Sequence, residues 1–307
     1  MTEFLLYLYA ESPVHTGAAD SLDLLDLPVQ REAATGYPVI WGQSLKGALR
    51  QAASDRRAAG DADGWTAAMV IQVFGSEPGE PDENRQTVPG MLAVGDAQLV
   101  AMPVPALRRT FAWVTSDIAL GRLARKYAAL DRAVPPVPSV AEERGAAPDQ
   151  RWTDTPDEAL GPCLVPLGGE PDEALRNWAD LIAGHAIGTG EPFRPFADKL
   201  RTDLLLTGSQ VMPALVRECT EQSVRVQLNK DKIVENGPFY SEYLPAETIL
   251  AASLMLRRPR DGAAEDHQAR VQAVRDLLDG KLLQVGGDET LGKGLVWGRL
   301  VEKEPVQ

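Results

Sequence analysis

Hydrophobic and polar residues alternate along several short stretches of the chain, and this alternation predicts β-strands. The first stretch covers residues 3–10, where Phe4 and two leucines share one face and Leu5 and two tyrosines share the other. Because both faces are apolar, we expect a central strand that is covered on both sides. The other predicted strands cover residues 91–100, 109–114, 224–228, 239–243, 249–256, 282–285 and 295–301.

Apolar residues recur at helical spacing in the segments between these strands. Ser44 has the side chain of a helix N-cap, and Leu45 and Leu49 follow it on one face. Other helices are predicted over residues 64–74, 117–130, 173–183 and 265–278. The order strand, helix, strand occurs near both ends of the chain. This order predicts an α+β fold of the ferredoxin-like type with large insertions between its halves.

The middle of the chain divides into segments of different character. Residues 134–148 contain four prolines and predict a linker or exposed loop. We therefore assign residues 1–130 and 245–307 to the main domain and residues 131–203 to an inserted helical and irregular region. Residues 204–244 form a separate region, in which alternating segments around Asn236-Gly237 predict a protruding β-hairpin.

Composition narrows the class of protein. The 307 residues are 44% hydrophobic and 24% charged, with a net charge of −13. This charge argues against a solitary RNA-coating protein, because phosphate binding depends on cations, but a shared groove between subunits stays open. No apolar run is long enough to span a membrane. Cys163 and Cys219 fit neither a zinc site nor a disulfide framework, so we expect a reduced, cytoplasmic protein.

The first candidate for chemistry is the loop that follows the first strand. A carboxylate there can accept the proton of an RNA 2′-hydroxyl or hold a divalent cation that lowers its pKa, while an arginine binds the phosphate. The plain alternative is a solvated loop whose acidic residues cap turns. The polar residues of this loop are His15, Asp20, Asp23, Asp26, Gln30 and Arg31.

The second candidate is the start of the helix around Ser44. Free N–H groups at a helix N-terminus bind phosphate, and Lys46 adds a positive charge there. Gly47 would let an RNA backbone come close, and Arg50 follows one turn later. The alternative is an ordinary capped helix with a solvated lysine.

The third candidate is the glycine-rich loop at residues 285–295. Such a loop can place N–H groups around an anion or lie flat against an RNA backbone, and the alternative is a tight hairpin. Its spacing excludes a Walker A motif. The relevant residues are Gly286, Gly287, Gly292, Lys293 and Gly294.

Together these segments resemble the RAMP superfamily of CRISPR proteins. Within it, the sequences at residues 26–32, 111–115 and 243–248 are similar to the fourth subunit of the type III-B Cmr effector complexes. The resemblance covers nearly the whole chain. It is densest in residues 1–50, 90–130, 239–256 and 284–300, and the first of these ranges is the most specific.

The resemblance implies a specific architecture and activity. The fold would be an RNA-recognition-motif-like palm with a β-hairpin thumb. Copies would form a helical filament on a CRISPR guide RNA with other Cmr subunits, and complementary target RNA would be cut at regular intervals. Asp26 matches the position of the cleaving aspartate, with a divalent metal, Mg²⁺ or Mn²⁺. His15 would assist, and Lys46 and the glycine-rich loop would face RNA.

Three other interpretations remain open at this point. The chain could be a non-catalytic RNA scaffold of the same complex, in which Asp26 is only a loop residue. It could be a stand-alone guide-processing endoribonuclease, although His15 has no evident catalytic partner histidine. It could also be an α+β protein unrelated to RNA.

Overall fold

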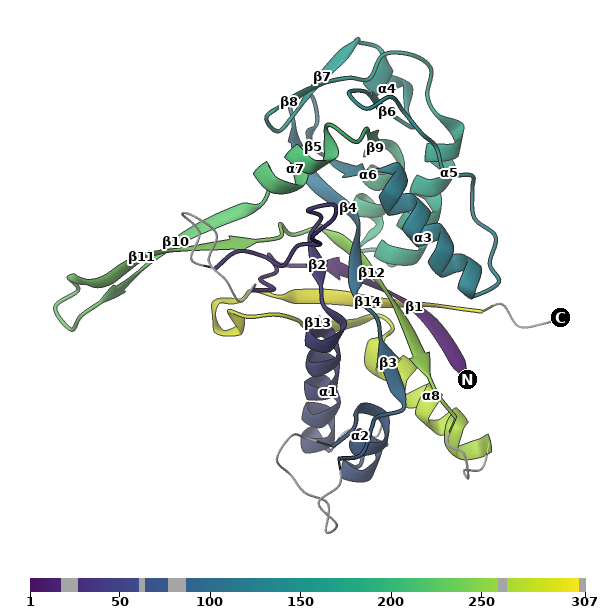
Figure 1. Cartoon of the computed structure of the whole chain (residues 1–307), viewed down its shortest axis with the longest axis vertical. Helices are drawn as coiled ribbons and strands as arrows, with labels where there is room; N and C mark the ends of the chain where they lie inside the picture. The colour runs from purple at the N-terminus through teal and green to yellow at the C-terminus, as the bar shows by residue number, and fades with distance from the viewer. Residues whose placement is uncertain (18–26, 61–63, 77–86, 259–263, 304–307) are drawn as a thin grey trace.

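The computed structural model describes residues 1–17, 27–60, 64–76, 87–258 and 264–303. In the described part, twelve strands form one mixed sheet and two more form a separate hairpin (Figure 1). The strands are β1 (Thr2–Ala10), β2 (Val39–Ile40), β3 (Leu92–Val94), β4 (Ala97–Ala106), β5 (Thr110–Thr115), β6 (Gly145–Ala146), β7 (Asp157–Leu160), β8 (Cys163–Pro166), β9 (Leu204–Thr207), β10 (Glu221–Leu228), β11 (Val234–Tyr243), β12 (Ile249–Leu256), β13 (Lys281–Gln284) and β14 (Leu295–Glu302).

Helices lie on both faces of the large sheet. The helical segments are α1 (Gly42–Ala59), α2 (Ala67–Phe74), α3 (Asp117–Ala129), α4 (Gln150–Thr153), α5 (Glu173–Ile182), the π-helix η1 (Ala183–Ile187), α6 (Arg194–Asp203), α7 (Met212–Glu218), α8 (Ala264–Leu278) and the 3₁₀ turn η2 (Glu289–Leu291). The predicted combination of helices with a large sheet is thus confirmed as a mixed α/β fold with a mixed sheet.

β1 is the central strand that its two apolar faces predict. It pairs antiparallel with β12 on one side and with β14 on the other. Phe4, Leu6 and Leu8 pack into a core with α1, α2 and α8. The opposite face, which includes Leu5 and Tyr7, packs into a second core with α3, α5 and α6. One strand therefore anchors two helical layers, which Figure 1 shows on either side of it.

Some element boundaries differ from the sequence-based expectations. The single strand predicted over residues 91–100 is split into β3 and β4, because Gly95 and Asp96 leave the strand. The interruption places Asp96 at the start of α1. Its carboxylate accepts a hydrogen bond of 2.7 Å from the N–H of Gly42, the first residue of that helix. The second helix begins at Ala67, later than predicted, because Thr66 caps it by accepting from the N–H of Met69 at 3.1 Å.

The region assigned to residues 131–203 contains more strand than predicted. β7 and β8 form a hairpin there, and β7 joins the large sheet through β4. The start of the region assigned to residues 204–244 also belongs to the body. β9 pairs parallel to β5 in the large sheet, and the buried side of α7 packs into a third core.

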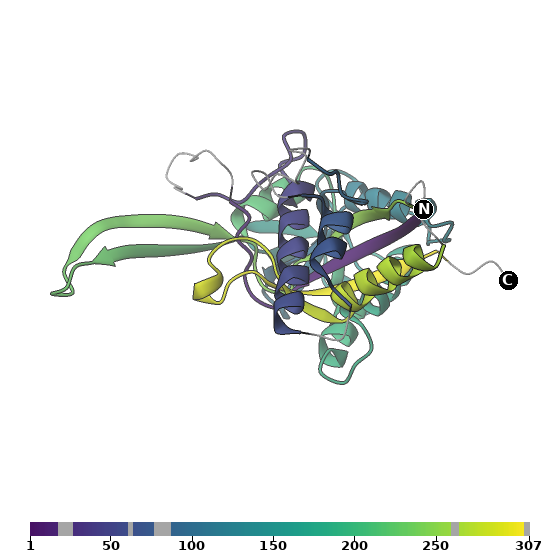
Figure 2. The same ribbon diagram turned by 90° about the horizontal axis from the view of Figure 1, so that it is seen from below.

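Among the described strands, β10 and β11 alone leave the body, as one long antiparallel hairpin (Figures 1 and 2). From Ser241 toward the tip of the hairpin, most of its described side chains are exposed, among them Val224, Ile233 and Phe239. A bulge near Val226 interrupts the pairing. Isolated two-stranded hairpins are marginally stable, so contacts at its base must hold its orientation.

Candidate nucleic-acid interface

Four segments that lie far apart in the sequence meet at the base of the β10–β11 hairpin. They are residues 13–17, residues 27–31, the end of β11 and the glycine-rich loop. Asp26 itself, with Asp20 and Asp23, lies outside the described residues. The residues that flank this segment are described, and both are held at the hairpin base. Gly17 forms a β-bridge with Val29, and Leu27 forms one with Ser241.

Glu242 is the buried centre of this junction, and sequence reasoning missed it. Its Oε1 accepts from Arg31 at 2.5 Å and from the Thr220 hydroxyl at 2.8 Å. Its Oε2 accepts from the N–H of Val29 at 2.9 Å. One carboxylate thus ties the segment after Asp26 to the end of β11. The local sequence gives little signal for Glu242, which directly precedes the motif at residues 243–248, because its partners Val29, Arg31 and Thr220 are remote in the chain.

The predicted RNA contacts Gln30 and Arg31 serve this junction in the structure. Gln30 donates from its side-chain amide to the carbonyl of Gly17 at 2.9 Å. Besides its ion pair, Arg31 donates to the carbonyls of Gly36 at 3.1 Å and Val216 at 3.0 Å. These bonds commit the Arg31 guanidinium to the protein, so its observed role is to hold the loop in place.

His15 is buried at the same junction, with 7% of its surface exposed. Its Nδ1 lies 2.8 Å from the carbonyl oxygen of Glu242. A carbonyl only accepts, so Nδ1 carries the hydrogen and the neutral ring has its lone pair on Nε2. A Cβ on Gly17 would lie 2.9 Å from Nε2, so the glycine leaves room for this ring. In its neutral form His15 therefore has an acceptor nitrogen, Nε2, next to Gly17.

The glycine-rich loop packs against His15, and four of its N–H groups donate to backbone carbonyls. The N–H of Gly287 donates to the His15 carbonyl at 2.9 Å, and that of Gly294 donates to the Pro13 carbonyl at 2.9 Å. Gly286 has a φ of +91°, and a Cβ there would lie 2.2 Å from the His15 oxygen. The N–H groups of Gly292 and Lys293 donate within the loop. Because they already have acceptors, these four N–H groups are not available to bind an anion.

The second group of predicted residues lies along α1. Ser44 is exposed but is not the N-cap; Trp41 holds that position, and Asp96 accepts from the first N–H. Gly47 is exposed, and a Cβ there would meet no atom within 4 Å. Arg50 donates to the carbonyl of Gly75 at 2.7 Å, which links α1 to the end of α2.

Lys46 lies among other cations. Burial lowers the pKa of Lys46, and the positive charges of Arg50 and Arg257 lower it further. Arg257 comes from the end of β12 and was not predicted, since nothing in its local sequence relates it to α1. An anion bound beside Lys46 would offset this repulsion and stabilise the charged form of the lysine.

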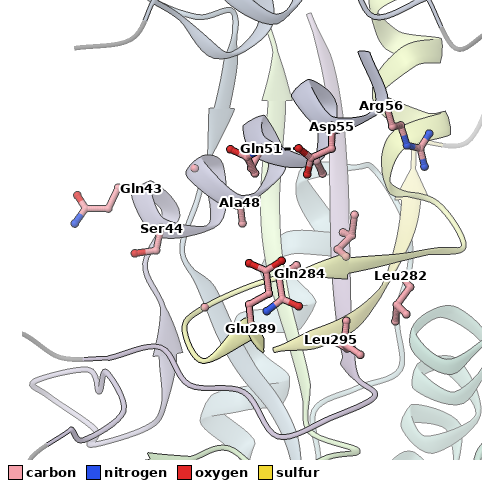
Figure 3. Close-up of a pocket in the computed structure, with 14 residues that line it drawn as sticks. Gln43, Ser44, Ala48, Gln51, Asp55, Arg56, Leu282, Gln284, Glu289 and Leu295 are labelled. Atoms are coloured by element: carbon pink, nitrogen blue, oxygen red, sulfur yellow. Dashed lines mark hydrogen bonds between the residues drawn. The ribbon is translucent and has the colours of Figure 1, made fainter. Parts of the chain in front are cut away.

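A cavity of about 710 Å³ lies between α1 and the glycine-rich loop, and so between two of the predicted RNA-contacting groups. Figure 3 shows α1 along one side of it and β13 with the glycine-rich loop along the other. Its charged lining residues, Asp55, Arg56 and Glu289, carry both signs, and the amides of three glutamines also reach it. Amides and hydroxyls hydrogen-bond sugars and bases as well as phosphates. The cavity therefore suits a polar ligand that is not bound by charge alone. The predicted RNA contacts that line it are Ser44, Gly47 and Gly286.

The described residues do not by themselves form a metal site. No group of three or more His, Cys, Asp or Glu side chains converges anywhere in the described ranges. At the junction, the Glu242 carboxylate is already engaged by Arg31, Thr220 and Val29. The predicted metal ligand, Asp26, lies outside the described part.

A search of the described helices for a membrane-spanning segment finds none of sufficient length and hydrophobicity.

The mixed α/β fold with its large sheet is consistent with a known superfamily of proteins. The chain matches the RAMP superfamily over residues 7–297 and belongs to it. It is 30% identical over 300 residues to the CRISPR system Cmr endoribonuclease Cmr4 of Pyrococcus furiosus, which covers 96% of this chain and 95% of that protein. The resemblance to the fourth Cmr subunit, predicted from the motifs, is thereby confirmed.

Solved structures agree with this similarity. Oligomeric Cmr4 from Pyrococcus furiosus has a TM-score of 0.72 and 28% identity, covering 100% of both chains. Another crystal structure of Cmr4 has a TM-score of 0.71 and 27% identity, covering 98% of this chain and 99% of that one. A chain of a type III-B Cmr-beta complex bound to cognate target RNA shares the fold, with a TM-score of 0.69 and 20% identity over 98% of this chain and 97% of that one.

Proposed function

We propose that this chain is a backbone subunit of a type III-B CRISPR effector complex, and that it cuts complementary target RNA through Asp26. The similarity to the Cmr endoribonuclease along the full chain is the observation that carries this proposal. The junction supports it, because Leu27 is bridged to Ser241 of β11 and Gly17 is bridged to Val29, so the described residues on either side of the Asp26 segment are both held at the hairpin base.

In this proposal the body is a ferredoxin-like palm and the β10–β11 hairpin is a thumb. The strand order β14-β1-β12-β3, with α1 and α8 packed on one face, supports the palm. The exposed hairpin supports the thumb. Further copies would stack along the guide RNA, as the oligomeric form of the Pyrococcus furiosus relative suggests. Other Cmr subunits would end the filament, and the complex would reside in the cytoplasm.

The proposed chemistry relies mainly on alignment. The hairpin would separate a target nucleotide from its neighbours, so that its 2′-hydroxyl can line up with the adjacent phosphorus. Asp26 would accept the proton of that hydroxyl as its oxygen bonds to phosphorus. The bond from phosphorus to the 5′-oxygen would break, leaving a 2′,3′-cyclic phosphate, and the departing 5′-oxygen would take a proton from water, with His15 assisting the proton transfer. On the guide strand, Lys46 and Arg257 would neutralise phosphates.

The first prediction concerns Asp26. In a complex reconstituted with guide RNA, Asp26→Asn should retain guide and target binding but cut target RNA at least 100-fold more slowly, on the order of one lost general base. Gel analysis of labelled target would measure both rate and cut positions. Asp154→Asn, an exposed aspartate of the insertion, is the matched control and should cut like the unmodified complex. Undiminished cutting by Asp26→Asn at the same positions would leave a scaffold role only.

The second prediction concerns the divalent metal, Mg²⁺ or Mn²⁺, which we include in the proposal at Asp26. Treating the assembled complex with EDTA should stop cutting while the guide RNA stays bound, and either ion should restore it. Retention of the guide would be followed by size-exclusion chromatography of the treated complex. Full activity after complete chelation would remove the metal from the proposal and leave Asp26 and His15 as the acid–base groups.

A further inference from the structure

Asp288, in the glycine-rich loop, contacts both strands of the hairpin. Its Oδ1 accepts from the Arg225 guanidinium of β10 at 2.9 Å. Its Oδ2 accepts from the Tyr243 hydroxyl of β11 at 2.7 Å. Lys293, from the same loop, lies with its ammonium 5.0 Å from the centre of the Tyr243 ring. A single carboxylate thus bridges the body and the two strands that leave it.

The loop that presents Asp288 is rigidly attached to the body. Asp288 itself has a φ of +60°, a left-handed conformation that non-glycine residues adopt at a cost. Its carbonyl accepts from the N–H of Leu291 at 2.9 Å, and the preceding Gly287 is bonded to His15. A backbone held in an unfavourable conformation by its surroundings directs its side chain to one place, which here is the hairpin.

Arg225 belongs to one strand of the hairpin and contacts the other. It lies within β10, opposite Phe239 in the strand register. Its guanidinium also donates to the Ser241 hydroxyl of β11 at 2.7 Å. Asp288 and Arg225 are both partly shielded from solvent, with 19% and 32% of their side chains exposed. Burial raises the pKa of Asp288, but hydrogen bonds from Tyr243 and Arg225 outweigh it, so the net pKa is lowered.

The length of the hairpin makes this contact mechanically important. From Glu221 to the turn near Asn229 the hairpin extends about 27 Å, at about 3.3 Å per residue. A tilt of about 10° at the base would move the tip by about 5 Å, which is large against the roughly 1 Å tolerance of reacting groups. Small changes at Asp288 are therefore amplified at the far end of the hairpin.

We propose that Asp288 is a positioning residue that sets the angle of the β10–β11 hairpin relative to the body, and so places the target strand at the Asp26 segment. This inference rests on the proposed function for its effect on cutting. The positioning itself is a property of the chain and can be measured without RNA. Asp288 touches neither the proposed reacting atoms nor, in this inference, the RNA.

The test compares Asp288→Asn, Arg225→Gln and the double variant. Each is made in the full chain and assembled with guide RNA. Glu302→Gln is the matched control, since it breaks an ion pair of similar exposure with Arg275 at the edge of β14. Hydrogen exchange of the isolated chain reports on the hairpin, and the cut ends of labelled target RNA report on placement.

We expect faster exchange in β10 and β11 in all three hairpin variants and unchanged exchange elsewhere. Target KM should change less than twofold, kcat should fall about tenfold or more, and cut ends should spread over neighbouring nucleotides. The double variant should resemble the single variants, because the residues act as one unit. A merely structural loss would reduce the active fraction without moving the cut ends.

Unchanged hairpin exchange in Asp288→Asn, or cutting with unmodified kcat and cut ends, would overturn the inference. Failure of the proposed function looks different. In that case the unmodified complex would not cut, or Asp26→Asn would cut normally, while hairpin exchange would still report on Asp288.

Discussion

Glu247 illustrates how burial changes the chemistry of one residue. It lies between β11 and β12 with a φ of +70°, and its carboxylate accepts from the Tyr9 hydroxyl. The N–H of Glu247 donates to the Ala10 carbonyl at 2.7 Å, and its own carbonyl accepts from Trp113 at 2.8 Å. Burial raises the pKa of Glu247 to about 7. The folded protein therefore binds a proton here that the unfolded chain releases near pH 4.

The third prediction follows from that pKa. A raised pKa stabilises the fold at low pH, so the contribution of Glu247 should be lost as pH rises from about 4 through about 7. Glu247→Gln keeps an acceptor for Tyr9 and should remove this dependence. At pH 8 it should raise the free energy of unfolding by about 2 kcal/mol, since solvent screens part of the shift.

Urea denaturation at pH 5 and pH 8 measures this effect. Glu143→Gln, at an exposed position, is the control and should follow the unmodified protein at both values. Equal destabilisation of Glu247→Gln at both pH values would show that the carboxyl is charged throughout, against the expectation.

At the scale of elements, α1 carries the most functional interest. It packs through Leu45, Leu49 and Ala53 and presents its other side to the cavity beside the glycine-rich loop. Gly47 lies on the exposed part of this helix. A glycine inside a helix destabilises it by about 0.5–1 kcal/mol relative to alanine, and no neighbouring atom of the described residues requires one there. A partner that approaches the helix closely would explain it.

The fourth prediction compares Gly47 with Gly121, a glycine of α3 at which an added Cβ would likewise meet no atom within 4 Å. Both Gly→Ala variants should raise the free energy of unfolding by about 0.5–1 kcal/mol. The larger Gly47→Leu should weaken guide RNA binding at least tenfold, because a side chain would hold the RNA away from Lys46. Filter binding with the assembled complex measures this.

Gly121→Leu should bind guide RNA as the unmodified chain does. Equal binding by Gly47→Leu and Gly121→Leu would mean that RNA does not approach α1 at this point. Equal loss in both would point to a general effect of the bulky residue on folding, which the denaturation curves would reveal.

At the scale of the whole molecule, the negative net charge and the protruding hairpin both bear on how the chain would bind RNA. The net charge of −13 makes strong RNA binding by a single copy unfavourable. The cations that are present near α1 are gathered locally, as the effect of Arg50 and Arg257 on Lys46 shows. A filament that shares one RNA among many copies adds weak contacts into a strong one. In the proposed filament, the protruding hairpin in Figure 2 would contact a neighbouring copy or the RNA.

The sequence by itself determined what depends on local pattern. The alternation of β1 predicted a strand covered on both faces, and apolar residues at helical spacing predicted a helix over residues 117–130, close to the observed bounds of α3. β12 matches its predicted range of residues 249–256. The motifs were sufficient to identify the family. Each of these signals is contained within a few turns or strand residues, where the side-chain period reports the structure directly.

Only the tertiary structure decided which remote residues meet. Glu242 contacts Arg31, which is 211 positions away in the sequence, and Asp288 contacts Arg225, which is 63 positions away. It also corrected the expectation that Ser44 caps α1, and it showed that Arg31 donates to the remote carbonyl of Val216. The physical reason is that such contacts depend on how β1, β11 and β14 are brought together in the sheet and at the hairpin base. No local period along the chain encodes that arrangement.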